Sequence, residues 1–379
     1  MPPLTYVAVD TAALRHNLAQ VRALLQPTTR VMAVVKAGGY GHGLVLAARA
    51  LAAGGAEWLG VSTLEEGVAL REAGVQGPVL VFLPGLPEEA GEFVAQGLSA
   101  TVVGETGLVA LARAAVKAGR AAHFHFYHDG GLGRPGVDDL PRLVELAAGF
   151  PGLELDGVYL HTDASAALNL GGLEVLRPGA EFRLFAAGVR EITTRLLGAP
   201  VPVHAAASAL TLRRPEARLD MVRLGTLLYG QYPASVPAAL RTLELRPTLA
   251  LRSTVVGVEK LPRGATVGYG AQYRCPRETR VGLLPVGYAV GLGTMPADLA
   301  RRRYASLRGL ARRLVRGEEP VAATIGGRPA AILGRIAMDW CCVDLTDLPE
   351  AGVGTEVTLP ARQALLDAGL ARVEGEGLG

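Results

Sequence analysis

The most informative stretch of the sequence is residues 30–43, which read Arg30-Val31-Met32-Ala33-Val34-Val35-Lys36-Ala37-Gly38-Gly39-Tyr40-Gly41-His42-Gly43. The run before Lys36 is apolar and largely β-branched, which predicts a buried strand. Lys36 stands where that strand ends, and four glycines follow within positions 38–43. A buried ammonium is costly, so a lysine at the end of a core strand needs a reason. It either does covalent chemistry, since a desolvated lysine can form a Schiff base, or caps the sheet and extends its charge to water.

The composition is that of a globular chain without a nucleic-acid partner. The chain has 379 residues, 50% of them hydrophobic, so we expect two domains with sizeable cores. Its net charge of +3 is small and spread along the sequence, whereas nucleic-acid binding needs clustered Lys and Arg beside aromatic platforms. Lysine is rare, occurring only at positions 36, 117 and 260, which makes Lys36 stand out further.

The cysteines and the N-terminus favour a cytoplasmic protein. Cys275, Cys341 and Cys342 form neither a disulfide framework nor a metal-binding spacing. The first residues, Met1-Pro2-Pro3-Leu4-Thr5, lack the basic and apolar segments of a signal peptide. No apolar run is long enough to span a bilayer, so we expect no membrane partner.

Short apolar strands alternate with helical patterns over the first part of the chain. The helices expected between them include Leu64–Ala73, Gly107–Ala118 and Phe182–Leu197. The expected strands are Val31–Val35, Trp58–Ser62, Pro78–Leu83, Ala100–Val103, His123–His128, Gly157–His161, Val203–Ala207 and Met221–Gly225. Eight such units in ~200–250 residues are typical of a parallel (β/α)8 barrel, which we predict for residues 1–235. An open doubly wound sheet is the alternative.

The pattern changes near Tyr232 and predicts a second, mostly β domain over residues 236–379. Its expected strands are Leu249–Val258, Ala265–Tyr269, Arg280–Gly287, Val321–Ile325, Ala330–Ile336 and Cys341–Leu345. An arginine-rich segment at residues 298–319 interrupts them and is interpreted as a solvated insertion. The tail from Ala361 begins with a helical pattern.

Chemically reactive residues gather where the expected barrel strands end, and this is the face that carries active sites in such barrels. They are Lys36, Tyr127, His128, Asp129, His161, His204, Ser208, Arg223 and Gly225. Each has an ordinary structural explanation of its own, but those explanations do not account for their convergence at one mouth.

Two other motifs suggest different kinds of site, a dinucleotide site and a zinc site. Gly131–Gly136 matches the G-x-G-x-x-G pattern, but it follows four strands and contains Pro135, which argues against a dinucleotide site. His123 and His125 could join His161 and His204 in a zinc site, as in barrel hydrolases. A core or supporting role for His123 is the preferred interpretation, and no metal is expected.

A late-strand glycine suggests a phosphate site. Arg223-Leu224-Gly225-Thr226 lies where barrels often bind phosphate, and no nucleoside-triphosphate motif is present. A lysine suited to a Schiff base together with such a phosphate cradle suggests pyridoxal 5'-phosphate.

These residues occur in motifs that resemble the alanine racemase family, the pyridoxal-phosphate enzymes of the barrel class. The likeness runs from about Tyr6 to Thr358. Its motifs are Val34–Gly43, Gly131–Arg134, Val203–Ala209, Met221–Gly225, Gly268-Tyr269-Gly270, Gly287-Tyr288-Ala289 and Gly334–Asp339.

The resemblance implies the role of each site residue. Lys36 would hold the cofactor and act as the base on one face of the substrate, and Tyr269, contributed by the partner in a homodimer, would act on the other. Tyr40, Ser208, Gly225 and Thr226 would hold the phosphate. Arg223 would face the pyridine nitrogen, with His161 beside it near Tyr269. Arg134 and the Met338 N–H would bind the substrate carboxylate, supported by Asp339.

The implied activity is interconversion of L- and D-alanine, supplying D-alanine for peptidoglycan. A related amino-acid racemase of different specificity, or a non-catalytic cofactor-binding homologue, is the alternative. Three departures bear on this choice. Tyr127 replaces a lysine that is usually carbamylated, Ala207 replaces an asparagine, and the expected C-terminal strand with its tyrosine is not recognisable.

Overall fold

The computed structural model describes residues 3–162, 180–293, 322–375 and 377–378, so the arginine-rich segment expected at 298–319 lies outside the described residues. The chain forms two compact units, one comprising Thr11–Thr248 and the other Met1–Asp10 together with Leu249–Leu378. The predicted division at 235/236 therefore differs from the structure in two ways. The barrel unit extends to Thr248, and the first ten residues belong to the β unit.

The unit Thr11–Thr248 is built on a parallel sheet of eight strands in the order β8-β7-β6-β5-β4-β3-β2-β9. The strands are β2 (Arg30–Val34), β3 (Trp58–Val61), β4 (Val79–Pro84), β5 (Ser99–Val102), β6 (Ala122–Asp129), β7 (Leu153–His161), β8 (Val203–His204) and β9 (Met221–Leu224). Its two end strands approach one another, since Arg223 N donates to Ala206 O at 2.8 Å beside an Ala207–Arg223 bridge. The barrel prediction is confirmed, and the open sheet is excluded.

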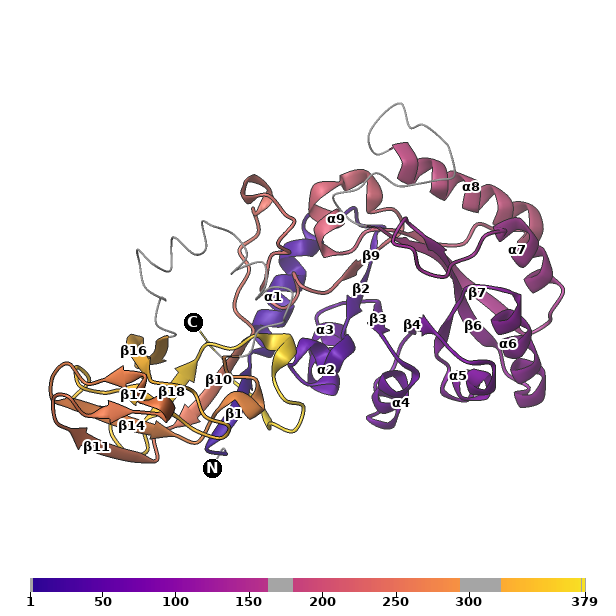
Figure 1. Cartoon of the computed structure of the whole chain (residues 1–379). Coiled ribbons are helices and arrows are strands. Elements are labelled where there is room, and N and C mark those ends of the chain that lie inside the picture. The colour runs from indigo at the N-terminus through magenta and orange to yellow at the C-terminus, as the bar shows by residue number, and fades with distance from the viewer. Residues whose placement is uncertain (1–2, 163–179, 294–321, 376, 379) are drawn as a thin grey trace. The chain divides into compact units, whose positions relative to one another are not determined.

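Helices cover the outside of this sheet (Figure 1). They are α1 (Thr11–Arg22), α2 (Lys36–Tyr40), α3 (Leu44–Ala53), α4 (Leu64–Glu72), α5 (Ala90–Gln96), α6 (Glu105–Ala118), α7 (Leu140–Ala148), α8 (Ala180–Leu197) and α9 (Ser208–Arg213), with 3-10 turns η1 (Pro87–Glu89), η2 (Pro215–Ala217) and η3 (Ala238–Leu240). In α6 the buried residues Leu108, Leu111, Ala112 and Ala115 recur at helical spacing. That apolar stripe fixes the face turned to the sheet.

The turn α2 is wound with the opposite hand. Ala37, Gly38, Gly39 and Tyr40 have φ of 54, 61, 65 and 53°. Two of the four are glycines, which adopt positive φ without the steric penalty of a side chain. The turn is closed where Gly39 N donates to the carbonyl of residue 35 at 2.7 Å. This left-handed turn directly follows Lys36 and carries Tyr40 at its end.

The β unit is organised around a nine-stranded sheet in the order β11-β14-β17-β16-β15-β18-β10-β1-β19, with β12 and β13 forming a separate pair. Its strands are β1 (Thr5–Val9), β10 (Leu249–Thr254), β11 (Gly257–Leu261), β12 (Thr266–Val267), β13 (Tyr273–Arg274), β14 (Thr279–Leu284), β15 (Ala322–Ile325), β16 (Arg328–Leu333), β17 (Cys341–Asp344), β18 (Glu356–Leu359) and β19 (Arg372–Glu374). Short 3-10 turns are η4 (Tyr269–Ala271), η5 (Tyr288–Val290) and η6 (Gln363–Leu365). The mostly β prediction is confirmed.

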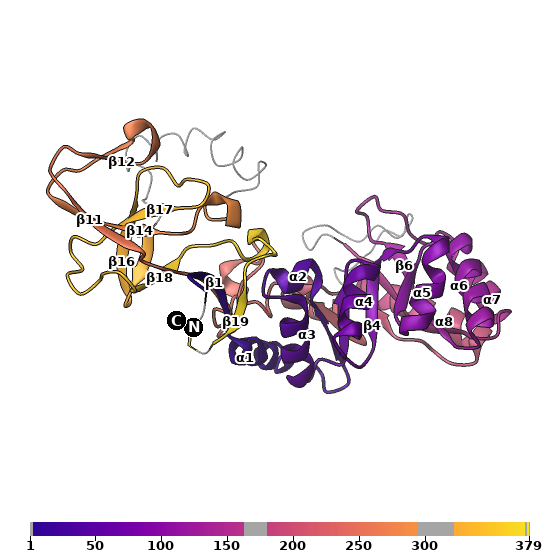
Figure 2. The same cartoon turned by 90° about the horizontal axis from the view of Figure 1, so that it is seen from below.

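The two ends of the described chain meet in this sheet. β1 pairs antiparallel with β10 and parallel with β19. Figure 2 shows β1 beside β19. The helical pattern expected from Ala361 is wrong, because that segment forms only the turn η6 before it extends into β19. A strand does therefore close the C-terminus, although its sequence gave no recognisable signal.

The free cysteines are core residues of the β unit. Cys275 and Cys342 pack with Val267, Val281 and Leu333, and Cys341 is fully buried next to them in β17. Among the helices that the structure describes, none has the length and apolar character needed to cross a membrane.

Candidate active site

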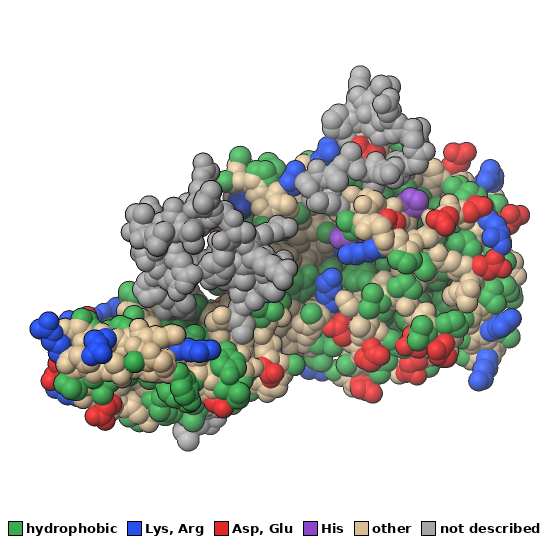
Figure 3. Space-filling model, in the orientation of Figure 1, with side chains coloured by type: hydrophobic (Ala, Val, Ile, Leu, Met, Phe, Trp, Pro, Cys, Tyr) green, Lys and Arg blue, Asp and Glu red, His purple; other side chains and the backbone are tan. Residues whose placement is uncertain are grey.

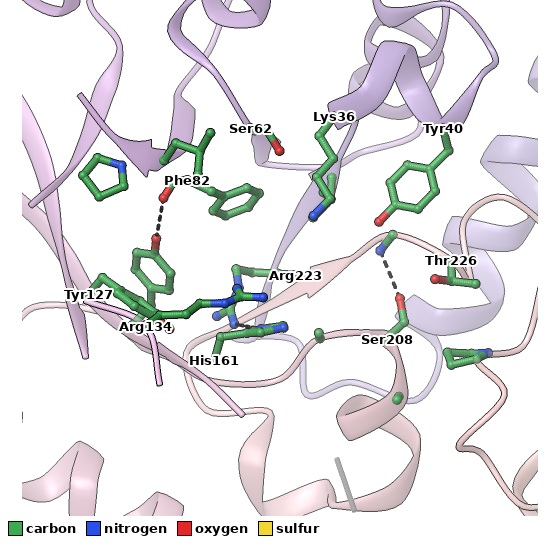
Figure 4. A pocket seen from close by; sticks show the side chains of 18 of the residues that line it. Lys36, Tyr40, Ser62, Phe82, Tyr127, Arg134, His161, Ser208, Arg223 and Thr226 are labelled. Carbon is green, nitrogen blue, oxygen red and sulfur yellow. Dashed lines mark hydrogen bonds between the residues drawn. The ribbon is translucent and has the colours of Figure 1, made fainter. Parts of the chain in front are cut away.

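A cavity of about 640 Å³ opens at the carboxyl ends of the barrel strands. A hollow on this face shows Lys or Arg and His side chains in Figure 3. Eight of the predicted site residues line the cavity, and Figure 4 shows most of their side chains: Lys36, Tyr40, Arg134, His161, Ser208, Arg223, Gly225 and Thr226. They come from segments spread over almost two hundred residues of sequence, and the closure of the barrel brings them together.

Lys36 enters the cavity directly from the end of β2. Its side chain is half-buried, and within the described residues it makes no hydrogen bond or ion pair. Burial, followed by the nearby cation of Arg134, lowers the pKa of the Lys36 amine. Both effects favour the neutral amine, which is the nucleophilic form.

Tyr40 is held by stacking. Its ring lies 4.5 Å from that of the buried Tyr229, at 22° between planes. A Cβ at Gly225 would overlap Tyr40 Oη, so only glycine allows the phenol to reach this point. Burial raises the pKa of Tyr40, which keeps the phenol protonated as a hydrogen-bond donor.

Ser208 and Gly225 form the opposite wall of the same corner. Gly225 N donates to Ser208 Oγ at 3.0 Å, a contact drawn in Figure 4. Ser208 also begins α9, whose first N–H groups have no partner within the helix. With Thr226 beside it, the corner presents hydroxyl and backbone donors suited to an anion.

Arg223 is 4% exposed and uses both terminal nitrogens inside the protein. Nη2 donates to Leu160 O at 2.8 Å and to Ala205 O at 3.0 Å. Nη1 donates to His204 Nδ1 at 3.0 Å. Within the described residues no carboxylate pairs with Arg223 and its Nε makes no hydrogen bond. Burial lowers the pKa of Arg223 to about 10, so the guanidinium stays charged at neutral pH.

His161 is neutral and its tautomer follows from its contacts. Burial, reinforced by the Arg223 and Arg134 cations, lowers the pKa of His161 to about 3. Its Nδ1 lies 3.3 Å from Arg223 Nη2 and must accept, because a guanidinium can only donate. The ring proton is therefore on Nε2, which makes that nitrogen a donor.

Arg134 is presented by a turn that follows β6. The carboxylate of Asp129 organises this turn by accepting from Leu132 N at 3.2 Å and Gly133 N at 2.9 Å. Tyr127 Oη donates to the same carboxylate at 3.3 Å. These bonds hold the pKa of Asp129 below its usual value although burial opposes them. Tyr127 thus supports Arg134 through Asp129.

The remaining predicted residues lie in the β unit. Tyr269 begins η4 and is 62% exposed, with its ring 6.1 Å from that of Trp340. Met338 is 55% exposed and Asp339 is exposed next to it. The segment at Gly268 approaches Gly334 closely, since a Cβ at Gly268 would lie 3.0 Å from the backbone N of Arg335. The two motifs are therefore packed against one another.

Comparison with known proteins extends over nearly the whole chain. The family description "Alanine racemase, N-terminal domain" matches residues 9–233, and "Alanine racemase, C-terminal domain" matches residues 248–371. The alanine racemase of Desulfosudis oleivorans is 34% identical over 366 residues, covering 93% of this chain and 86% of that protein. That of Geobacillus stearothermophilus is 34% identical over 363 residues, covering 95% and 84%.

The chain belongs to the alanine racemase family. The solved alanine racemase from Streptomyces lavendulae has a TM-score of 0.75 at 31% identity, covering 100% of this chain and 98% of that one. The enzyme from Streptomyces coelicolor gives 0.70 at 32%, covering 97% and 90%. The family resemblance expected from the motifs is confirmed, and the activity of this isomerase is the interconversion of L- and D-alanine.

Several cavity residues of this alanine racemase fold were missed in the sequence. Tyr159, Phe82 and Ser62 line the cavity, and Tyr159 lies under the Arg223 guanidinium at 5.1 Å. Glu66 was also missed. It accepts from Ser62 N at 2.8 Å, and its negative charge opposes the lowering of the Lys36 pKa. Tyr159 could have been found, because it precedes His161 by two positions and so shares its face of the strand.

The two rejected motifs have structural roles. Gly131–Gly136 forms the turn that carries Arg134, and α7 begins only at Leu140. His123, near the start of β6, donates from Nδ1 to Asp156 Oδ1 at 3.1 Å. Among the described residues there is no group of three or more side chains able to hold a metal ion.

Proposed function

We propose that the barrel cavity binds pyridoxal 5'-phosphate and that Lys36 and Tyr269 are the two bases of the racemisation. The observation that carries the cofactor assignment is a set of donors around one cavity that have no partner among the described residues. They are the Lys36 amine, the Arg223 Nε, and the donors of the Tyr40–Ser208–Thr226 corner. When bound through its aldehyde carbon to an amine, the cofactor withdraws electrons and acidifies the α-hydrogen of an amino acid.

The cavity residues match the phosphate and the pyridine nitrogen of such a molecule, as Lys36 matches its aldehyde. Tyr40, Ser208, Thr226 and the backbone at Gly225 bind the phosphate, as the anion-binding character of their corner supports. Arg223 would face the pyridine nitrogen of the bound cofactor. Because a guanidinium cannot give up its proton near pH 7, Arg223 would leave that nitrogen unprotonated and so weaken the electron withdrawal that the cofactor supplies. Racemisation is then favoured over transamination.

Lys36 holds and moves the proton on one face of the α-carbon. Its lowered pKa supplies a neutral amine at the pH of the cell. A base on the opposite face is needed for inversion, and Tyr269 is the candidate that the family motif supplies. A tyrosine with a pKa near 10 needs nearby cations to act as a base. We assign that role to Arg223, acting through His161.

Tyr269 reaches the cavity of a second copy, so the active unit is a homodimer. The exposure of Tyr269 and Met338 on the β unit supports this, because both are large apolar groups left open to solvent in one chain. The Met338 N–H and Arg134 bind the substrate carboxylate, and Asp339 stands beside them. In the cell we place this enzyme in the cytoplasm, supplying D-alanine for peptidoglycan.

The two-base assignment is tested by α-hydrogen exchange. The protein and its Lys36→Ala and Tyr269→Phe variants are incubated with L- or D-alanine in deuterated water. We expect Lys36→Ala to lose the absorption of the bound cofactor and all exchange. Tyr269→Phe should keep the cofactor but abolish inversion. Lys260→Ala and Tyr273→Phe are matched controls, since Lys260 forms a surface ion pair and Tyr273 packs in the β core. If Tyr269→Phe racemised L- and D-alanine as fast as the wild-type protein does, Tyr269 would have no part in the mechanism.

Sharing of sites is tested by mixing two inactive variants. Coexpressed Lys36→Ala and Tyr269→Phe chains form mixed dimers with one intact site, which predicts recovery of about a quarter of the wild-type activity. Mixed dimers without activity would show that Tyr269 serves its own chain.

A further inference from the structure

A row of buried polar groups runs through the barrel from the cavity toward the amino ends of the strands. It starts at Arg223, whose charge has no carboxylate partner in the described part of the chain. A buried cation normally requires pairing as well as hydrogen bonds. The groups next in line are His204 in β8 and His125 in β6, both fully buried. Ser99 begins β5 and is 2% exposed, and Asp156 lies in β7.

The tautomer of His204 is determined by Arg223. The guanidinium donates to His204 Nδ1 at 3.0 Å, so this nitrogen carries a lone pair. Burial, followed by the Arg223 charge, holds the pKa of His204 well below its usual value, so the ring is neutral. Its single proton must therefore be on Nε2. That N–H is buried and has no partner among the described residues.

The tautomer of His125 is determined from the other end and is the opposite one. Ser99 Oγ donates its only proton to Asp156 Oδ2 at 2.6 Å. The hydroxyl can then only accept from His125 Nδ1, 3.0 Å away, so the His125 proton is on Nδ1. Burial lowers the pKa of His125 to about 4, so this ring is also neutral. His125 Nε2 is thus a lone pair, and it too has no partner.

The two unpartnered nitrogens are complementary in kind, and they belong to neighbouring rings. The rings lie 5.2 Å apart at 86°, one offering a donor and the other an acceptor. Gly157 leaves room beside His125, since a Cβ there would lie 3.0 Å from Nε2. Buried polar atoms are rarely left unsatisfied, and each one costs about 1–3 kcal/mol.

We propose that His204 Nε2 donates to His125 Nε2, through at most one buried water, and completes a relay from Arg223 to Asp156. Every hydrogen bond in it then points the same way, from the guanidinium through both imidazoles and the serine hydroxyl to the carboxylate. Such chains polarise one another and strengthen the bonds in them. Asp156 is accordingly the remote counter-charge of Arg223, and Ser99 and Asp156 are positioning residues for it. Their effect on the cofactor rests on the proposed function, whereas the relay itself does not.

Imidazole ¹⁵N NMR of the holoenzyme, ring-labelled at its seven histidines, tests the relay directly. We expect His204 protonated only at Nε2 and His125 only at Nδ1. Ser99→Ala removes the acceptor for His125 Nδ1, so the His125 proton should move to Nε2 and the His204 Nε2 shift should change. Ser99→Thr keeps the hydroxyl and should restore the wild-type shifts. His123→Gln is the matched control, because His123 contacts the other oxygen, Oδ1, of Asp156. It should leave both tautomers unchanged.

An unaltered His204 shift in Ser99→Ala, or the same tautomer in both histidines, would overturn the relay. Absorption of the bound cofactor is the second readout. Ser99→Ala should shift its maximum, and Ser99→Thr should reverse that shift. If the tautomers respond while the absorption does not, the relay holds but Arg223 does not face the pyridine nitrogen. In that case the proposed function, and not the relay, fails.

Discussion

Tyr127 supports the turn that carries Arg134 by a single hydrogen bond. The Tyr127 phenol bonds to Asp129 and thereby to the turn that presents Arg134. The bond is long at 3.3 Å, and Asp129 keeps two backbone donors without it. The Tyr127 hydrogen bond therefore strengthens the turn, but the two backbone bonds to Asp129 can hold the turn without it.

For Tyr127→Phe we predict a rise in the KM for alanine of about fivefold, which corresponds to roughly 1 kcal/mol for one hydrogen bond. The value of kcat should change little, because the proton-transfer groups are untouched. Steady-state kinetics in both directions measure this, with Tyr273→Phe as the control. An unchanged KM would show that Asp129 holds the turn without Tyr127.

Two buried histidines make the barrel sensitive to acid. The pKa of His125 is about 4 and that of His204 is also lowered, whereas both return to near 6.5 in the unfolded chain. At a pH between the folded and unfolded pKa values, the unfolded chain binds more protons than the folded one. The contribution of these histidines to the free energy of unfolding is therefore complete above about pH 6.5 and falls as the pH decreases. Each histidine contributes roughly 1.4 kcal/mol per pH unit in that window. His161, whose pKa is also lowered, acts in the same sense. His123 acts in the opposite sense, because its hydrogen bond to Asp156 raises its pKa.

We therefore predict that the free energy of unfolding of the barrel decreases steeply from pH 6.5 to 5.5. Urea unfolding in a Trp340→Phe background follows this by fluorescence, since Trp58 is then the only tryptophan and its ring lies 5.2 Å from that of His125. His125→Gln should flatten the slope by roughly 1.4 kcal/mol per pH unit. A slope equal to that of the wild type would show that His125 is not neutral in the fold.

The left-handed turn after Lys36 is the element on which the site depends. A Cβ at Gly38 would meet no atom within 4 Å, so only its φ of 61° limits what can replace it. Asparagine tolerates that conformation, whereas a β-branched residue does not.

Gly38→Asn should accordingly change the unfolding free energy by less than about 0.5 kcal/mol, while Gly38→Val should cost about 1–2 kcal/mol. Gly107→Val is the matched control, because Gly107 also has open space around its Cβ position but lies in the regular helix α6. Urea unfolding measures all three variants. A neutral Gly38→Val would contradict the left-handed assignment.

The same elements show what the sequence could predict. The eight barrel strands were found within a few residues, because buried parallel strands are continuous apolar runs. The residues at their ends then gave six that line the cavity, whereas Tyr40 and Arg134 were assigned only from the family resemblance. The six are Lys36, Tyr127, His161, Ser208, Arg223 and Gly225. The turn α2 was not predicted, since glycines permit positive φ without specifying it. β1, β18 and β19 were missed because short strands carry little periodicity, and their pairing joins distant parts of the chain.

At the scale of the whole molecule, β1 is the strand that joins the beginning of the chain to the β unit. It lies inside the sheet, between β10 and β19, with Val7 and Val9 fully buried. Removing it would leave β19 without a partner and one edge of β10 unpaired, since β10 keeps only β18.

A chain that starts at Thr11 should therefore keep a folded barrel and lose the β unit. Tryptophan fluorescence reports on the unfolding of the two units separately, because Trp58 lies in the barrel and Trp340 in the β unit. We expect native fluorescence from Trp58 and an early unfolding midpoint from Trp340. A chain starting at Leu4 is the control, since β1 is then intact. Equal midpoints for Trp340 in both chains would contradict the structural role of β1.

The position of β1 also sets an order of events during synthesis. β1 is synthesised long before β10 and has to wait for it, and its other edge stays open until β19, where Val7 pairs with Arg372, has been made. Meanwhile Thr11–Thr248 contains every strand that its own sheet requires. The barrel can thus fold while translation continues, and the β unit, which carries Tyr269, is completed last. An unpaired apolar strand edge is exposed for that interval. We therefore expect the β unit, rather than the barrel, to depend on chaperones for folding.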